Sequence, residues 1–320
     1  MSRPAGPLLR PGSTGTSDHE AAPAEGLPSL ASALARAPSE NFPVALGLLR
    51  PDHRDDLMAV YGFARLVDDL GDEALGDRPA LLDAAERELE TAFAGRATHP
   101  AFRRLEPAIR RRALTPDPFL ALIEANRQDQ VVHRYATFDE LVRYCRLSAN
   151  PVGHLVLAVF GLDTPSNRRW SDAICTGLQL AEHWQDVGED ARRGRIYVPL
   201  ADLAAAGCSE GDLALAPPPP RIRRLLAGEA ARARRLLDAG LPLVRALRGR
   251  PRLAVAAYVG GGRAALDALA GAGFDSVTSS PRATNRARVR ATVGVLRDAL
   301  VGRRATRSRS TWPPGEERPR

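Results

Sequence analysis

The chain has 320 residues and a formal net charge of +7, and only 5% of its residues are aromatic. The positive charge is concentrated at the carboxyl end, where residues 281–320 hold eleven arginines against three acidic residues. A nucleic-acid-binding fold spreads its basic residues over the folded surface and interleaves aromatics, so we expect no nucleic-acid partner.

The cysteine pattern and the apolar runs predict a cytoplasmic location. Cys145, Cys175 and Cys208 are far apart and form no CxxC pair, which indicates neither a disulfide framework nor a zinc site. The first residues contain no apolar stretch typical of a signal peptide. The longest apolar run, residues 155–162, is far shorter than the ~20 residues of a membrane-spanning helix.

The chain is expected to form one all-α domain over residues 28–302. Residues 1–27 and 303–320 are rich in Pro, Gly, Ser or Arg and have no apolar periodicity, which predicts disorder, with a basic tail at the end. Between them, apolar residues spaced by three and four predict helices over residues 51–67, 81–94, 118–135, 138–160 with a kink at Pro151, 170–190, 221–237 and 251–270.

A first acidic motif follows the helix expected over residues 51–67. Asp68 and Asp72 are four residues apart and therefore share one helix face, with Asp69 between them and Arg65 one turn earlier. Like charges at this spacing destabilise a helix by roughly a few tenths of a kcal/mol, so their presence needs a reason. A hard cation such as Mg²⁺, which prefers oxygen ligands, supplies one.

A second acidic motif lies at the end of the helix expected over residues 170–190. Glu182, Asp186 and Asp190 again recur every four residues and line one face. Cationic and hydroxyl side chains that suit a diphosphate follow at once, namely Arg192, Arg193, Arg195 and Tyr197. Each motif alone is compatible with a solvated acidic helix end, but together with the arginine cluster they favour a site for metal ions and a diphosphate.

These motifs and several other stretches resemble the hydroxysqualene synthase branch of the squalene/phytoene synthase family. The resemblance extends over roughly residues 38–300. The stretches that carry it are residues 41–45 (NFPVA), 61–73 (YGFARLVDDLGDE), 127–129 (RQD), 134–137 (RYAT), 144–153 (YCRLSANPVG) and 184–187 (WQDV).

The resemblance implies a single-domain prenyl-synthase (class I isoprenoid synthase) helical fold with a central cavity. It implies an enzyme that converts presqualene diphosphate and water to hydroxysqualene and diphosphate, with two or three Mg²⁺ ions and without NADPH. Other enzymes of the same pathway would supply the substrate and reduce the product. A head-to-head prenyltransferase, as in squalene or phytoene synthases, and an inactive scaffold relative remain alternatives.

The matching positions also imply residue roles. The metal ligands would be Asp68, Asp69, Asp72, Asp186 and Asp190, with Glu182 as an added or substitute ligand. Arg65, Arg195 and Gln179 would bind the diphosphate. Tyr61 would assist at the diphosphate, and Tyr144 would stabilise or deprotonate a cationic intermediate through its ring and hydroxyl.

Two departures from the family pattern affect these roles. Glu182 stands where the family usually has Asn, and His183 follows where an apolar residue is usual. Asn150 and Pro151 replace the Gly-Thr that squalene and phytoene synthases commonly carry. A buried amide is costly unless it is hydrogen-bonded, so Asn150 is either bonded within the fold or holds the water that captures the cation.

The remaining charged and histidine residues carry weaker indications. The lone histidines His133 and His154 are expected to be ordinary core or surface groups. The arginine run over residues 221–235 is expected to be a solvated helix face or, with the basic tail, a peripheral contact with anionic lipid on the inner face of the membrane.

Overall fold

The computed structural model describes Leu27 and residues 49–301. The amino-terminal segment predicted to be disordered, apart from Leu27, the motif at residues 41–45 and the basic tail at residues 303–320 lie outside the described residues. Over residues 49–301 the backbone is helical, with no β-strand and one isolated parallel bridge between Arg134 and Ile196. The prediction of an all-α fold is confirmed.

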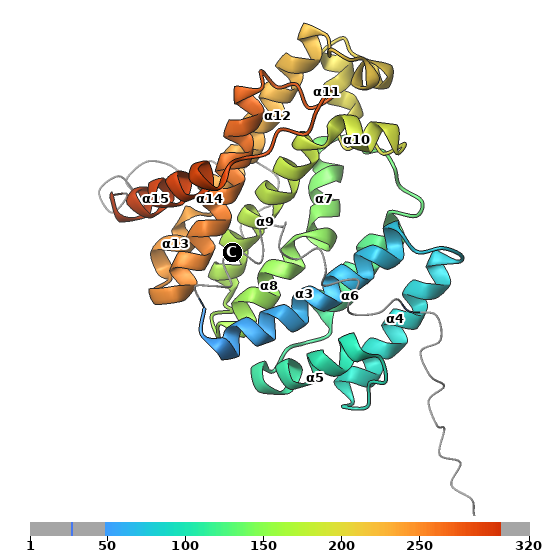
Figure 1. The fold of residues 1–320 in the computed structure, drawn as a ribbon, viewed down its shortest axis with the longest axis vertical. Helices are drawn as coiled ribbons and strands as arrows, with labels where there is room; N and C mark the ends of the chain where they lie inside the picture. The colour runs from blue at the N-terminus through green and yellow to red at the C-terminus, as the bar shows by residue number, and fades with distance from the viewer. Residues whose placement is uncertain (1–26, 28–48, 302–320) are drawn as a thin grey trace, which may run out of the picture.

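The helices run in the following order along the chain (Figure 1). They are α3 (Pro51–Asp72), α4 (Arg78–Phe93), α5 (Pro100–Arg112), α6 (Asp117–Gln128), α7 (Phe138–Ser148), α8 (Asn150–Val159), α9 (Pro165–Gln185), α10 (Val187–Arg192), α11 (Leu200–Ala205), the 3₁₀ helix η2 (Glu210–Ala214), α12 (Pro220–Ala239), α13 (Leu241–Ala246), α14 (Gly249–Gly271) and α15 (Asn285–Val301).

The helices pack around two apolar cores. The first is formed mainly by α3, α4, α5, α6 and α8, and at its centre the ring of Phe63 makes edge contacts with Phe102 and Phe119. The second is formed mainly by α7, α9, α12, α13 and α14 and includes the fully buried Trp184. In Figure 1, α8 and α9 run through the middle of the molecule between the two groups. The carboxyl ends of α3 and α9 thereby meet at the border of the two cores.

Three predicted helices end or break inside their predicted ranges. The helix predicted over residues 138–160 is two helices that meet at Ala149, just before Asn150 and Pro151, because proline lacks an amide hydrogen and restricts the preceding residue. The helix predicted over residues 170–190 breaks at Asp186, whose φ of −109° and ψ of 13° are not helical. The helix predicted over residues 118–135 ends at Gln128.

Helix α14 is the one described helix that is long and apolar enough to cross a membrane. However, 61% of its most apolar window is buried inside the protein, and it packs against α9, α12, α13 and α15. Its glycines permit this close packing, since a Cβ atom at Gly260 would lie 2.7 Å from the backbone of Thr292 on α15. Helix α14 is therefore a buried helix of the protein core.

A buried carboxyl group on α12 gives the fold a testable pH dependence. Glu229 is 2% exposed, its Oε2 has no hydrogen-bond partner, and burial raises its pKa to about 7 although Arg232 lies 3.1 Å away. Because the folded state binds this proton more tightly than the unfolded state, stability falls as pH rises from about 4.5 to about 7.

Glu229→Gln is therefore expected to raise the free energy of unfolding by about 3 kcal/mol at pH 8 and to leave it unchanged at pH 4. Urea denaturation at both pH values measures this difference, and Glu90→Gln, an exposed position on α4, is the control. A gain of equal size at both pH values would contradict ionisation as the cause.

Candidate active site

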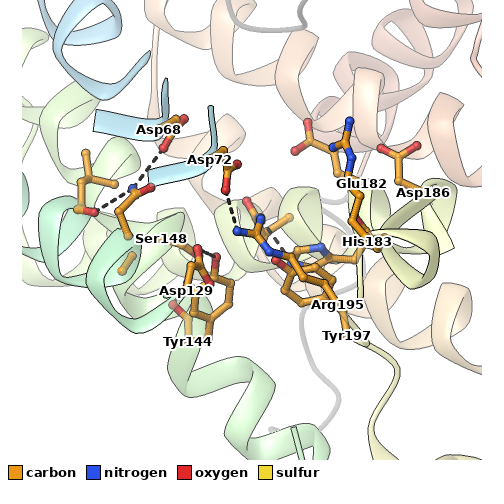
Figure 2. Close-up of a pocket in the computed structure, with 16 residues that line it drawn as sticks. Asp68, Asp72, Asp129, Tyr144, Ser148, Glu182, His183, Asp186, Arg195 and Tyr197 are labelled. Carbon is orange, nitrogen blue, oxygen red and sulfur yellow. Dashed lines mark hydrogen bonds and ion pairs between the residues drawn. The ribbon is translucent and has the colours of Figure 1, made fainter. Parts of the chain in front are cut away.

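A polar pocket of about 280 Å³ lies between the carboxyl ends of α3 and α9 (Figure 2). Helices α6, α7 and α10 and the segment after α10 complete its wall. Eight of the twelve predicted site residues line it, and they are Asp68, Asp72, Tyr144, Gln179, Glu182, Asp186, Asp190 and Arg195. The two acidic motifs, more than 100 residues apart in sequence, thus face one pocket.

The α3 wall presents Asp68 and Asp72 on one helix face. Asn126 on α6 donates its side-chain amide to Asp68 Oδ1 at 3.2 Å. Burial, with the nearby carboxylates of Asp72 and Asp129 adding to it, raises the pKa of Asp68 to about 7. This wall therefore holds more negative charge than its protein partners neutralise.

Arg195 lies between the two acidic walls (Figure 2). Its Nη2 atom donates to Asp72 Oδ1 at 2.7 Å, and its pKa is raised well above the ordinary value despite burial because Asp72 holds the guanidinium charged. The backbone fixes its position: the amide of Arg195 bonds to Asp190 O, that of Ile196 bonds to His133 O, and Gly194 has a φ of +80° that suits glycine.

The α9–α10 wall presents Glu182, Asp186 and Asp190. Burial and the neighbouring Asp186 raise the pKa of Asp190 to about 7. Arg282, from the segment between α14 and α15, donates its Nη2 to both carboxylate oxygens of Asp186 at 2.8 and 3.1 Å. Arg282 was not predicted as a site residue, because nothing local distinguishes it from the other arginines near the carboxyl end.

The segment that carries Arg282 is held against the site by backbone contacts. Gly188 donates its amide to Ser276 O at 3.0 Å, and Gln185 donates its side-chain amide to Pro281 O. A Cβ atom at position 188 would lie 2.7 Å from Val277 Cα, so only glycine allows the segment to approach this closely.

Gly188→Ala is expected to lower the free energy of unfolding by about 1–3 kcal/mol, because the added methyl group overlaps backbone atoms of Val277. Chemical denaturation measures the loss. The matched control is Gly228→Ala on α12, where a Cβ meets nothing within 4 Å and the change is expected to be neutral or stabilising by up to about 1 kcal/mol. Equal effects at the two positions would refute the packing argument.

An aromatic wall closes one side of the pocket. The rings of His183 and Tyr197 stack with their centroids 3.7 Å apart, and Tyr144 lies beside both. The Tyr144 hydroxyl donates to Asp129 Oδ2 at 2.7 Å, and burial raises the pKa of Tyr144 well above its ordinary value. Burial and Arg195 lower the pKa of His183 to about 3, so its imidazole is neutral.

Four predicted site residues do not line the pocket. Asp69 is buried and pairs with Arg65 at 2.9 Å, and Tyr61 is buried one turn before Arg65 on α3. Asn150 is buried and accepts a hydrogen bond from Thr176 Oγ1 at 3.0 Å. The Asn150 side chain is thus hydrogen-bonded within the fold, which is one of the two expectations for it. That Asn150 holds the water molecule that captures the cation stays a prediction.

Several pocket residues received no role from sequence reasoning. The residues that line the pocket and were assigned no role are Leu122, Ala125, Asn126, Asp129, Ser148 and His183. Arg193 and Tyr197, expected among the groups that suit a diphosphate, also line it. Asp129 stands in the quoted stretch 127–129, which was the available signal. Asn126 and Ser148 gave none, since their contribution depends on how α6 and α7 pack beside α3.

The pocket residues fit a bound divalent cation. Within residues 49–301, no three His, Cys, Asp or Glu side chains already form a metal-binding group. Instead, two sets of carboxylates face each other and engage arginines, Asp72 with Arg195 and Asp186 with Arg282. Mg²⁺ binds carboxylate oxygens and completes its shell with phosphate oxygens of a substrate. The pocket offers carboxylates on opposite walls, and two of them, Asp68 and Asp190, have raised pKa values.

A smaller apolar cavity of about 80 Å³ lies where the two cores meet. It is lined by side chains from α8, α9, α13 and α14, including Val156, Ile174, Leu178 and Tyr258. Leu178 in its lining directly precedes Gln179 in the lining of the polar pocket. The molecule therefore combines a charged pocket with an adjacent apolar interior.

Residues 35–293 match the family model of squalene/phytoene synthases. The chain belongs to this family. It is therefore an isoprenoid-processing enzyme. The predicted prenyl-synthase fold is confirmed, because the chain has the same helical architecture as its structural relatives.

Relatives within the family differ in their activities. The chain is 40% identical over 206 residues to a hydroxysqualene synthase of Rhodopseudomonas palustris, which covers 64% of this chain and 70% of that protein. It is 37% identical over 212 residues to a phytoene synthase of Arthrospira platensis, covering 62% and 69%. The crystal structure of squalene synthase HpnC from Alicyclobacillus acidocaldarius superposes with a TM-score of 0.72 at 45% identity, covering 77% and 94%.

Proposed function

We propose that this enzyme converts presqualene diphosphate and water to hydroxysqualene and diphosphate in a Mg²⁺-dependent reaction. The observation that carries the proposal is the pair of facing acidic walls with Arg195 between them. Similarity to hydroxysqualene synthases, at 40% and 38% identity, favours this reaction among those of the family.

The acidic walls are the proposed metal-binding residues. Asp68 and Asp72 on one side, and Glu182, Asp186 and Asp190 on the other, would hold the ions. When bound, Mg²⁺ would neutralise charge on the departing diphosphate and so lower the barrier to ionisation.

The arginines are the proposed diphosphate-binding residues. Arg195 now pairs with Asp72 and Arg282 with Asp186, so both guanidinium groups lie at the carboxylates that the ions would occupy. On substrate binding the two guanidinium groups would exchange their carboxylate partners for diphosphate oxygens. They would then bind the substrate through charge-assisted hydrogen bonds. Gln179, in the same wall, would add a neutral donor.

The aromatic wall would face the cation left on the hydrocarbon. Because the pKa of Tyr144 is raised and its hydroxyl already donates to Asp129, the tyrosine stays protonated and its ring, rather than a phenolate, would stabilise the cation. Water capture forms a carbon–oxygen bond and releases one proton. The apolar cavity beside Gln179 would hold part of the hydrocarbon.

Head-to-head condensation of two prenyl diphosphates is the second candidate. It is favoured by the similarity to phytoene synthases, among them that of Arthrospira platensis at 37% identity. Both reactions would use the same polar pocket and differ in how the cation is resolved.

One incubation experiment separates the two candidates. The purified full chain is incubated with Mg²⁺ and without NADPH, either with presqualene diphosphate or with farnesyl diphosphate, and the lipid product is identified by mass spectrometry. We expect hydroxysqualene from presqualene diphosphate and no C30 product from farnesyl diphosphate. Formation of squalene-type or phytoene-type hydrocarbons from unfused prenyl diphosphates would establish the second candidate instead.

A further inference from the structure

Helix α15 presents an uncovered apolar stripe to its surroundings. Val289, Val293 and Leu300 are 64%, 61% and 64% exposed, although large aliphatic side chains are usually buried. They are spaced by four and seven residues and so lie along one side of the helix. The opposite side, with Val295 and Ala299, is buried in the protein.

An arginine stripe runs beside the apolar stripe. Arg286, Arg290 and Arg297 fall next to Val289, Val293 and Leu300 on the helical wheel, and all three arginines are exposed. The one acidic residue of α15, Asp298, is engaged with Arg263 of α14 at 2.8 Å. The outer face of α15 is thus apolar along one edge and purely cationic along the other.

We propose that this outer face of α15 docks onto the surface of an anionic lipid bilayer. A helix with an apolar stripe and flanking arginines lies in the membrane interface, where its aliphatic side chains enter the acyl boundary and its guanidinium groups reach lipid phosphates. Each arginine near an anionic surface adds to the attraction, which weakens with salt.

The charge pattern argues against two other occupants of this face. A second copy of the chain, related by a two-fold axis, would bring two arginine stripes together without any acidic residue to pair with them. The following residues 302–320 carry six arginines and two glutamates, so they would be repelled by the stripe and attracted by the same anionic surface.

Docking through α15 would also orient the active-site pocket. Helix α15 begins at Asn285, three residues after Arg282, which bonds to Asp186 in the wall of the pocket. Its position is fixed by close packing on Gly260 of α14 and by the ion pair between Arg263 and Asp298. A bilayer bound to α15 would therefore lie beside the pocket, on the side from which Arg282 enters, whichever isoprenoid reaction the pocket performs.

Vesicle flotation with the full chain tests the proposal. Phosphatidylcholine vesicles with and without phosphatidylglycerol serve as probes, at low and high salt. Val289→Ser/Val293→Ser/Leu300→Ser removes the apolar stripe and keeps every charge, whereas Arg286→Gln/Arg290→Gln/Arg297→Gln removes the charges and keeps the apolar stripe. The control Arg87→Gln/Arg103→Gln/Arg104→Gln removes the same charge from exposed positions on α4 and α5.

We expect the wild type and the control to bind phosphatidylglycerol vesicles and each α15 variant to bind about 10- to 100-fold more weakly. Circular dichroism and turnover of detergent-dispersed substrate should be unchanged in all four proteins. Undiminished binding by the serine variant, or no binding by the wild type, would overturn the proposal. A wild-type dimer that the serine variant disperses in analytical ultracentrifugation would instead assign the face to a second copy.

Discussion

Replacing Asp72 or Asp186 with asparagine is expected to lower kcat by about 10³-fold, the largest effect among single substitutions in this protein. The two residues stand on opposite walls of the pocket, and each carboxylate is now paired with an arginine, Arg195 and Arg282 respectively. Asparagine keeps the size of the side chain and removes the charge that a divalent cation requires.

Steady-state turnover at increasing Mg²⁺ concentration measures the effect of these substitutions. The Mg²⁺ concentration for half-maximal activity should rise in both variants, and the protein should remain folded, because removing one like charge relieves the repulsion around Asp68 and Asp190. Asp55→Asn, an exposed position on the same helix as Asp72, is the control and should turn over normally. Wild-type turnover in the Asp72 and Asp186 variants would show that the acidic walls do not hold the ions.

Replacing Arg195 with glutamine is expected to lower kcat by about 10²- to 10³-fold. The guanidinium lies between the two acidic walls, so its loss removes a donor for the diphosphate and the partner of Asp72. Arg195→Lys should recover part of the activity, because it restores the charge without the fork of parallel donors.

The control for Arg195 is Arg168→Gln, which breaks a surface ion pair with Asp163 away from the pocket and should leave turnover unchanged. Release of diphosphate, followed together with loss of substrate, gives kcat and KM for each variant. A rise in KM with kcat unchanged would contradict a role in ionisation and reduce Arg195 to ground-state binding.

The parts of the pocket lining that follow from the sequence are those encoded by short-range spacing. Asp68 and Asp72 share a helix face by their separation of four, and Glu182 and Asp186 do so for the same reason. Placing both sets at one site rested on their shared chemistry and on the arginine cluster, since periodicity within one helix gives no information about which helix lies opposite.

The parts that were missed depend on contacts between distant segments. Arg282 reaches Asp186 across 96 residues, and it does so because Gly188 admits the backbone of Val277. Asp129 follows the end of α6, and its partner Tyr144 lies on the next helix. The role of each residue arises only when the helices pack, although Asp129 stands in the quoted stretch 127–129.

Some helix boundaries likewise follow from the local sequence and could be predicted, whereas others depend on tertiary packing and could not. The break before Asn150 and Pro151 follows from the chemistry of proline and was predicted as a kink. Helices α5 and α15 were not predicted, since α5 contains Pro107 and both are rich in arginine, which obscures the apolar spacing. Their buried faces, such as Phe102 and Leu105 of α5, are stabilised by packing on neighbouring helices.

Isotope labelling tests the central claim, water capture of a cation after diphosphate departure, most directly. Presqualene diphosphate and Mg²⁺ are incubated with the enzyme in ¹⁸O-labelled water, and the lipid and the released diphosphate are analysed by mass spectrometry. The proposed reaction predicts hydroxysqualene that carries one ¹⁸O atom in its hydroxyl group and diphosphate that carries none. Label in the diphosphate, or a C30 product without oxygen, would contradict it.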